Sequence, residues 1–217
     1  MQHCVLNLVR AASRRYCSTA YPILSGLGSS AQQVLDGLSD TFSNANVSEP
    51  ITSAQLIVGE VLGITNIDLL PQVIEHSHFT TEQLGRLEQM TQCRLARMPV
   101  QYILGYWDFR QIRIKTRPPV FIPRCETEEL VGLVLDYLKS FKCSNIIQVL
   151  EIGCGSGVIT LSILKEHKTE HNSVNIIAVD QSNSACSLTV ENAMALDLLT
   201  QPIEEAANNI NESNQGR

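Results

Sequence analysis

A glycine-rich turn between two apolar segments restricts this chain to a narrow set of folds. Residues 151–157 read Glu-Ile-Gly-Cys-Gly-Ser-Gly and directly follow a continuous apolar run, which predicts a buried strand over residues 146–152. A helix over residues 158–164 then leads to a second strand over residues 175–180, which ends in Asp180. Strand, glycine turn, helix, strand and acid in this order are typical of one βαβ unit of a nucleotide-binding α/β fold.

The residues of this turn indicate which kind of cofactor it holds. Glycines allow a tight turn and a close approach of the backbone to a ligand, and a terminal acid can accept hydrogen bonds from ribose hydroxyls. The acid at Glu151 disfavours the pyrophosphate of a dinucleotide but attracts the ammonium and sulfonium groups of S-adenosylmethionine. A dinucleotide and a glycine turn without a ligand are the alternatives. The predicted cofactor-binding residues here are Glu151, Gly153, Cys154, Gly155, Ser156, Gly157 and Asp180.

Three segments upstream of the turn carry a family resemblance. Residues 99–105 read Pro-Val-Gln-Tyr-Ile-Leu-Gly, residues 107–109 read Trp-Asp-Phe, and residues 121–130 read Phe-Ile-Pro-Arg-Cys-Glu-Thr-Glu-Glu-Leu. In this order and spacing they resemble the HemK family of glutamine methyltransferases, which modify peptide-chain release factors. The resemblance covers roughly residues 52–192. It implies an α/β protein with an N-terminal helical bundle, a β-hairpin linker and a class I, Rossmann-like methyltransferase domain that uses S-adenosylmethionine.

The resemblance also implies further site residues and a partner. Arg124, Glu126 and Thr127 fall on the segment that approaches the cofactor from the linker side, although Cys125 stands where the family usually has proline. The acidic residues after Cys125 also suit the first turn of a helix, where its dipole favours anions. The partner implied is a peptide-chain release factor, whose Gly-Gly-Gln glutamine is the methyl acceptor and which the helical domain docks.

One motif of the family is missing. The acceptor motif Asn-Pro-Pro-Tyr orients the amide nitrogen toward the methyl group, and this sequence contains no Asn-Pro dipeptide. We therefore assign no catalytic residue and expect a C-terminally truncated, marginally stable domain that transfers little or no methyl group by itself. Two other hypotheses are a non-catalytic module that binds the release factor or the cofactor, and a methyltransferase of the same fold with another substrate.

Composition divides the chain into six predicted segments. The first 35 residues contain Arg10, Arg14 and Arg15 but no acid, which is typical of mitochondrial import and predicts a matrix protein; an ordinary N-terminus is the alternative. Residues 18–50 suggest a linker with a short helix around residues 31–38. The segments are 1–17 transit peptide, 18–50 linker, 51–100 helical release-factor-docking domain, 101–124 hairpin linker, 125–200 partial methyltransferase domain and 201–217 disordered tail.

Local signals predict helix ends and exclude some functions. Thr52 with Gln55 and Thr80 with Gln83 are capping boxes that begin helices, and Gly63 ends one.

The net charge of −6, without a dense cluster of lysine and arginine, speaks against nucleic-acid binding. No apolar run approaches the length of a membrane span. The seven cysteines form no Cys-x-x-Cys pair, so we expect free thiols and no metal site, with Cys154 a small buried side chain rather than a reactive thiol.

Overall fold

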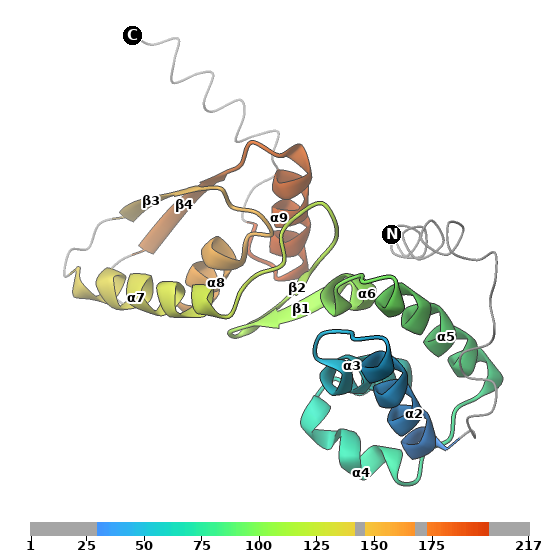
Figure 1. The fold of residues 1–217 in the computed structure, drawn as a ribbon. Coiled ribbons are helices and arrows are strands. Elements are labelled where there is room, and N and C mark those ends of the chain that lie inside the picture. Colours follow the sequence, from blue (N-terminus) through green and yellow to red (C-terminus); the bar gives the residue numbers. More distant parts are fainter. Residues whose placement is uncertain (1–29, 142–145, 168–172, 200–217) are drawn as a thin grey trace. The chain divides into compact units, whose positions relative to one another are not determined.

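The computed structural model describes residues 30–141, 146–167 and 173–199, which form two compact units divided after Gly105 (Figure 1). The predicted transit peptide and C-terminal tail lie outside these residues. The described elements of the first unit are α2 (Ala31–Asn44), α3 (Pro50–Leu62), η1 (Ile67–Leu69), α4 (Leu70–Ile74), α5 (Thr81–Leu95) and α6 (Val100–Leu104). Those of the second unit are β1 (Tyr106–Phe109), β2 (Ile112–Lys115), α7 (Glu126–Ser140), β3 (Ile146–Ile152), α8 (Val158–Glu166), β4 (Ser173–Val179) and α9 (Asn183–Ala195).

Local sequence signals set most helix boundaries of the first unit. The Thr80 hydroxyl accepts the Gln83 N–H at 3.2 Å and the Gln83 side chain accepts the Thr80 N–H at 2.9 Å, which confirms this capping box. Gly63 ends α3 with a φ of 74°, in the left-handed region that favours glycine. The predicted capping box at Thr52 is wrong, because Pro50 occupies the first turn and the helix begins before Thr52.

The segment before α3 is more ordered than its polar composition predicted. The sequence suggested a linker over residues 18–50 with a helix around residues 31–38, whereas α2 continues to Asn44. Leu38 and Phe42 lie four residues apart on one helical face, are fully buried and belong to the stripe that packs on α3. The helical unit therefore includes residues 31–50, because this apolar stripe outweighs the serine and asparagine content.

The α3 helix is the central element of the first unit. Its side chains Ile57 and Val58 are fully buried, and it packs against α2, α5 and α6. Among the described residues, no single helix is long and apolar enough to cross a membrane, although α3 and the segment Ile67–Ile74 pass that test together as a pair bent by 89°. The burial of α3 within this unit explains its apolar composition.

A buried arginine joins α5 to the residues around α3. Arg94 is only 7% exposed, and its guanidinium donates to the Ser53 hydroxyl at 3.0 Å, the Ser48 carbonyl at 2.8 Å and the Met98 carbonyl at 3.1 Å. A buried charge is tolerated only with such partners. Arg94 therefore fixes the packing of the helices around it.

The hairpin of β1 and β2 belongs to the core of the second unit. The strands pair antiparallel as predicted, with Phe109 opposite Ile112. The sequence predicts a linker over residues 101–124, but Phe109, Ile112 and Ile114 are almost completely buried in one cluster with residues of α7 and α8. Removing the hairpin would therefore open the core of the second unit rather than shorten a connection.

The β3 and β4 strands form the predicted parallel pair. β3 has the predicted bounds, while β4 runs from Ser173 to Val179. Their register places Ile152 beside Val179, so both strands end at the same edge of the sheet. The α8 helix provides the crossover that parallel strands require. The glycine turn after β3 and Asp180 after β4 therefore meet at this edge.

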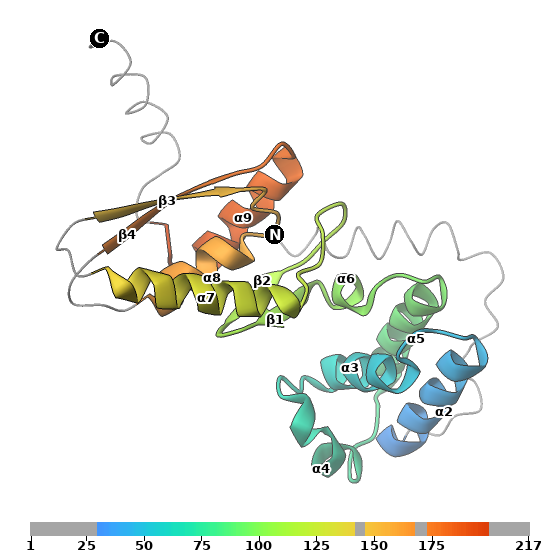
Figure 2. The same ribbon diagram turned by 60° about the vertical axis from the view of Figure 1, so that its left-hand side comes forward.

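Only one face of this sheet is covered by described residues. Figures 1 and 2 show α7 and α8 on the same side of the sheet, where they pack with Ile147, Val149, Val174 and Ile176. The opposite face, called here the open face, exposes between 42% and 80% of the side chains of Ile146, Leu150, Ile152, Ile177 and Val179. The prediction of a buried β3 is thus wrong for alternate residues. Parallel sheets are normally covered on both faces.

Leucine-to-alanine substitutions on the covered side and on the open face of the sheet should destabilise the second unit to different extents. Leu161→Ala removes a side chain that is 1% exposed and should lower the unfolding free energy of the second unit by about 2–5 kcal/mol. Leu150→Ala, at a site 61% exposed on the open face, should lower it by less than about 1 kcal/mol and slow aggregation. Urea unfolding followed by fluorescence of Trp107, the only tryptophan, reports on this unit. Equal losses for the two variants would contradict an open face.

Candidate functional site

One cavity collects most of the predicted site residues. It measures about 810 Å³ and lies at the ends of β3 and β4, with the segment 119–124 along one side. Its volume is in the range of small-molecule sites. Among the predicted residues, those that line it are Arg124, Thr127, Glu151, Gly153, Cys154, Gly155, Ser156 and Asp180; Glu126 and Gly157 do not line it.

The glycine turn is fastened to the end of the neighbouring strand. The amides of Gly153 and Cys154 both donate to the Val179 carbonyl, at 2.7 and 3.1 Å. Gly155 and Gly157 have φ angles of 57° and 85°, so both need the left-handed conformation. A Cβ on Gly157 would also lie 2.9 Å from the Thr189 methyl carbon. Gly157 therefore faces the helix behind the turn instead of the cavity.

Asp180 connects the two strand ends through its carboxylate. Its oxygens accept the Ser182 N–H at 2.9 Å and the Gly155 N–H at 3.0 Å. The Ser182 N–H, followed by that of Gly155, lowers the pKa of Asp180 and keeps it ionised. Because a carboxylate has about four acceptor positions, Asp180 can still accept hydrogen bonds from two ligand hydroxyls.

Glu151 has a structural role that the sequence did not predict. One carboxylate oxygen accepts both the Thr160 hydroxyl and the Thr160 N–H, the latter at 3.2 Å. Thr160 lies in the first turn of α8, and the N-cap residue Gly157 supplies no side-chain cap, so Glu151 satisfies this helix end from the preceding strand. Desolvation raises the pKa of Glu151 in spite of these bonds. Glu151 is nevertheless one of the residues that line the cavity.

Of the three cofactor-binding residues predicted in the segment before and at the start of α7, two line the cavity. Arg124 and Thr127 line the cavity, whereas Glu126 is exposed in the first turn of α7. A hydrogen bond from its own backbone N–H, the Cys125 side chain and the charge of Arg124 lower the pKa of Glu126. This geometry favours the alternative role of Glu126, which is to stabilise the start of α7.

Cys154 is a buried thiol at the base of the turn. It is 4% exposed, and the Thr189 hydroxyl oxygen lies 3.4 Å from its sulfur. Burial raises the pKa of Cys154, which disfavours the reactive thiolate. The geometry therefore favours a small filling side chain over a nucleophile. Within residues 30–141, 146–167 and 173–199 no group of three potential metal ligands occurs.

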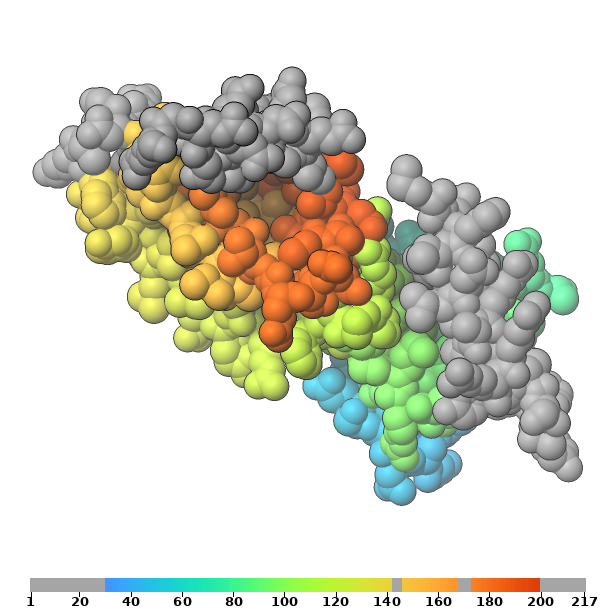
Figure 3. Space-filling model, turned by 90° about the horizontal axis from the view of Figure 1, so that it is seen from above, coloured from blue at the N-terminus to red at the C-terminus, as the bar shows by residue number. Residues whose placement is uncertain are grey.

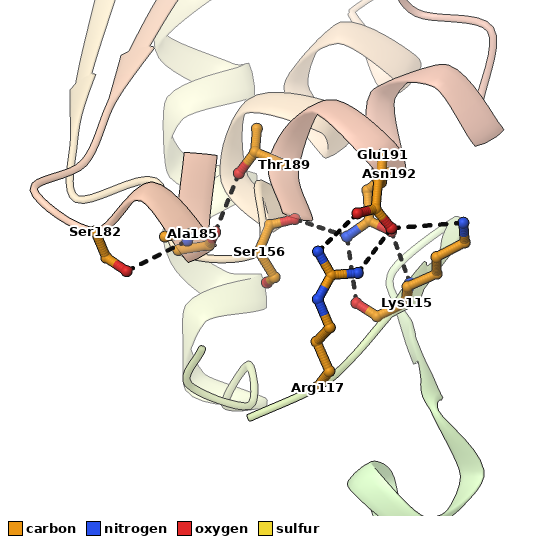
Figure 4. Close-up of polar contacts among 9 residues, drawn as sticks. Lys115, Arg117, Ser156, Ser182, Ala185, Thr189, Glu191 and Asn192 are labelled. Atoms are coloured by element: carbon orange, nitrogen blue, oxygen red, sulfur yellow. Dashed lines mark hydrogen bonds and ion pairs between the residues drawn. The ribbon is translucent and has the colours of Figure 1, made fainter. Parts of the chain in front are cut away.

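Sequence reasoning missed the side chains that support the turn from behind. Ser182 caps α9 by accepting the Ala185 N–H, while Thr189 and Asn192 on α9 donate to carbonyls of the turn (Figure 4). Thr160 on α8 was also missed. Ser182 lies three positions before its partner Ala185, which is the ordinary N-cap spacing. No spacing rule identifies Thr160, Thr189 and Asn192, because their partners lie 9 to 36 positions away. The only available signal was a polar residue on a helix face expected to be buried.

The raised pKa of Glu151 predicts a specific change of stability with pH. A raised folded-state pKa stabilises the fold below the unfolded value, and this contribution is lost as the pH rises through the folded value. Glu151→Gln keeps an acceptor for Thr160 but carries no charge. The variant should therefore gain stability relative to wild type as the pH rises from about 4.5 upward. Thermal melts of both proteins between pH 4 and 8 measure this difference, and a difference independent of pH would contradict the assignment.

Comparison with known proteins finds one family model and a group of named relatives. The model described as the PrmC N-terminal domain matches residues 33–105. The human MTRF1L release factor glutamine methyltransferase is 40% identical over 181 residues, which cover 82% of this chain and 52% of that protein. The release factor glutamine methyltransferase of Aliivibrio fischeri is 38% identical over 112 residues, which cover 52% of this chain and 37% of that protein. The release factor glutamine methyltransferase of Caulobacter vibrioides is 30% identical over 162 residues, which cover 75% of this chain and 53% of that protein.

These similarities extend over both units. The PrmC model matches the helical unit. An alignment of 181 residues is longer than either unit, so the similarity to the human protein includes residues of both. The chain spans about half the length of the human and Caulobacter relatives. The chain belongs to the HemK family of release factor glutamine methyltransferases, and its second unit has that family's α/β, class I methyltransferase fold.

Proposed function

We propose that the cavity at the ends of β3 and β4 binds S-adenosylmethionine. The observation that carries this proposal is the position of Asp180, whose ionised carboxylate is tied to the glycine turn and faces the same cavity as Glu151. Asp180 would accept hydrogen bonds from the ribose hydroxyls. The turn would contact the ligand with its backbone, as the positive φ angles of its glycines allow.

The charges of the cavity support a cationic cofactor over a dinucleotide. Among the described residues, two acids, Glu151 and Asp180, and one arginine, Arg124, line it. Carboxylates repel a pyrophosphate but attract an ammonium or a sulfonium in a partly desolvated site. When bound, S-adenosylmethionine supplies the methyl group that is transferred; Asp180, Glu151 and the turn would hold it in place.

We further propose that the full activity is methylation of the glutamine amide in the Gly-Gly-Gln motif of a peptide-chain release factor. The names of the relatives support this substrate, and the match of residues 33–105 to the PrmC N-terminal domain supports the helical unit as the docking surface. An amide nitrogen is a weak nucleophile, so the reaction depends on orienting it. The sequence has no Asn-Pro dipeptide to provide the family's acceptor motif.

The missing acceptor motif predicts that cofactor binding and methyl transfer are separable in this chain. Incubation of residues 1–217 with a release factor and S-adenosylmethionine labelled in its methyl group should transfer no label to the glutamine above the level without protein. The reason is that no described residue of the proposed cofactor site is assigned to orient the amide nitrogen. Robust glutamine methylation, detected by peptide mass spectrometry, would contradict this expectation.

We propose the mitochondrial matrix as the location. The support is the N-terminal composition, with Arg10, Arg14 and Arg15 preceding the first acid at Asp36. Import would remove about the first 16–20 residues, so the mature protein would begin near residue 17 to 21. A mature protein that retains Met1 would exclude a cleaved transit peptide.

The cofactor proposal predicts a binding constant that depends on one carboxylate. Titration of S-adenosylmethionine into the full chain by calorimetry should give saturable binding, and Asp180→Asn should weaken it roughly 10- to 100-fold, because hydrogen bonds to a charged acceptor are replaced by weaker ones. Asp136→Asn is the matched control, since Asp136 is an exposed acid on α7 that does not line this cavity. Absence of binding by a folded wild-type chain, or equal binding by the Asp180 variant, would refute the proposal.

A further inference from the structure

The back of the glycine turn is held by one face of α9. The Thr189 hydroxyl donates to the Gly155 carbonyl at 3.1 Å, and the Asn192 amide donates to the Ser156 carbonyl at 2.9 Å (Figure 4). Thr189 and Asn192 are three residues apart, so they lie on the same helix face. Two consecutive carbonyls of the turn are therefore bonded to α9.

These bonds fix Gly155 from both sides. Its N–H donates to Asp180 at 3.0 Å, and its carbonyl accepts from Thr189. Because a trans peptide is planar, fixing each carbonyl also fixes the N–H of the following residue, which points the opposite way. The direction of the turn's amides thus depends on side chains of α9. With a φ of 57°, Gly155 would otherwise have the wide conformational freedom of glycine.

Asn192 also joins the turn to the hairpin. It is 1% exposed, accepts the Lys115 N–H at 2.7 Å and donates to the Lys115 carbonyl at 3.2 Å, so its side-chain amide is bonded to both β2 and the turn. The carboxylate of the neighbouring Glu191 accepts hydrogen bonds from both Nη atoms of Arg117, each at 2.7 Å, and none from the turn. α9, orange-red in Figure 3, reaches the molecular surface. The Glu191 side chain is partly exposed.

We propose that Thr189 and Asn192 are positioning residues, which set the shape of the glycine turn for its cofactor without touching the cofactor. Neither residue lines the cavity. This inference rests on the proposed binding of S-adenosylmethionine and deepens it, because it places part of the control of affinity on α9. The hairpin is part of the same network through Lys115.

A pair of substitutions at Thr189 separates a hydrogen-bonding role from a packing role. Thr189→Val keeps the side-chain shape and the methyl group near Gly157 but loses the donor to Gly155. Thr189→Ser keeps the donor and loses the methyl group. The dissociation constant for S-adenosylmethionine, measured by calorimetry on the full chain, should rise roughly tenfold in Thr189→Val and stay within about threefold of wild type in Thr189→Ser.

A second pair of substitutions compares Asn192, which is bonded to the turn, with its neighbour Glu191, which is bonded to Arg117. Asn192→Asp removes both donors and places a carboxylate against two carbonyls, so it should weaken binding by about tenfold or more. Glu191→Gln weakens the bond to Arg117 without touching the turn and should change the dissociation constant by less than about threefold. If Asn192→Asp fails to fold, which a thermal melt detects, the Thr189 pair decides alone.

The outcomes distinguish this inference from the proposed function. Weaker binding in Thr189→Ser than in Thr189→Val, or wild-type affinity in both variants, would overturn the positioning role while leaving cofactor binding intact. No binding by the folded wild-type chain would overturn the proposed function, and this inference with it. Weakening confined to Thr189→Val and Asn192→Asp, with melting temperatures of the Thr189 pair close to wild type, is the expected result.

Discussion

Two backbone hydrogen bonds to one carbonyl hold the glycine turn in place. The Val179 carbonyl accepts from both Gly153 and Cys154, so the turn after β3 cannot separate from the end of β4. This carbonyl is available because the parallel register ends the two strands side by side. The position of Asp180 follows from the same register, and its carboxylate adds a third connection at Gly155. The candidate site is therefore a direct consequence of strand pairing.

The surroundings of the turn explain how a small sheet can support a site. Glu151 and Thr160 connect the end of β3 to the first turn of α8, while Thr189 and Asn192 connect α9 to the turn. The hairpin completes the arrangement, because it packs its apolar side chains into the same core and bonds to α9 through Lys115. The turn is thus enclosed by α8 and α9 and leaves its other side to the cavity. Of the open face, only Ile152 and Val179 at the strand ends line the cavity, whereas Ile146, Leu150 and Ile177 do not.

The strand order, the hairpin and most of the candidate site were predictable from the sequence, because they depend on local patterns. Alternation with polar residues at Trp107 and Phe109, and again at Ile112 and Ile114, predicts the hairpin. The glycine spacing with Asp180 predicts the meeting of the strand ends. The dual role of Glu151 and the contributions of Thr189 and Asn192 were not predictable, since each depends on partners brought near by the fold. The exposure of Leu150 was missed for a similar reason: an apolar run cannot tell whether one or both faces are covered.

Amide chemical shifts test, residue by residue, whether the turn and Asp180 form a site for S-adenosylmethionine. The full chain, labelled with ¹⁵N, would be titrated with S-adenosylmethionine and, separately, with NAD as the dinucleotide alternative. Binding at the turn should give saturable shifts at Gly153, Cys154 and Gly155 with S-adenosylmethionine, no comparable shifts with NAD, and unchanged amides in α2–α5. Shifts caused only by NAD, or no shifts at the turn of a folded chain, would contradict it.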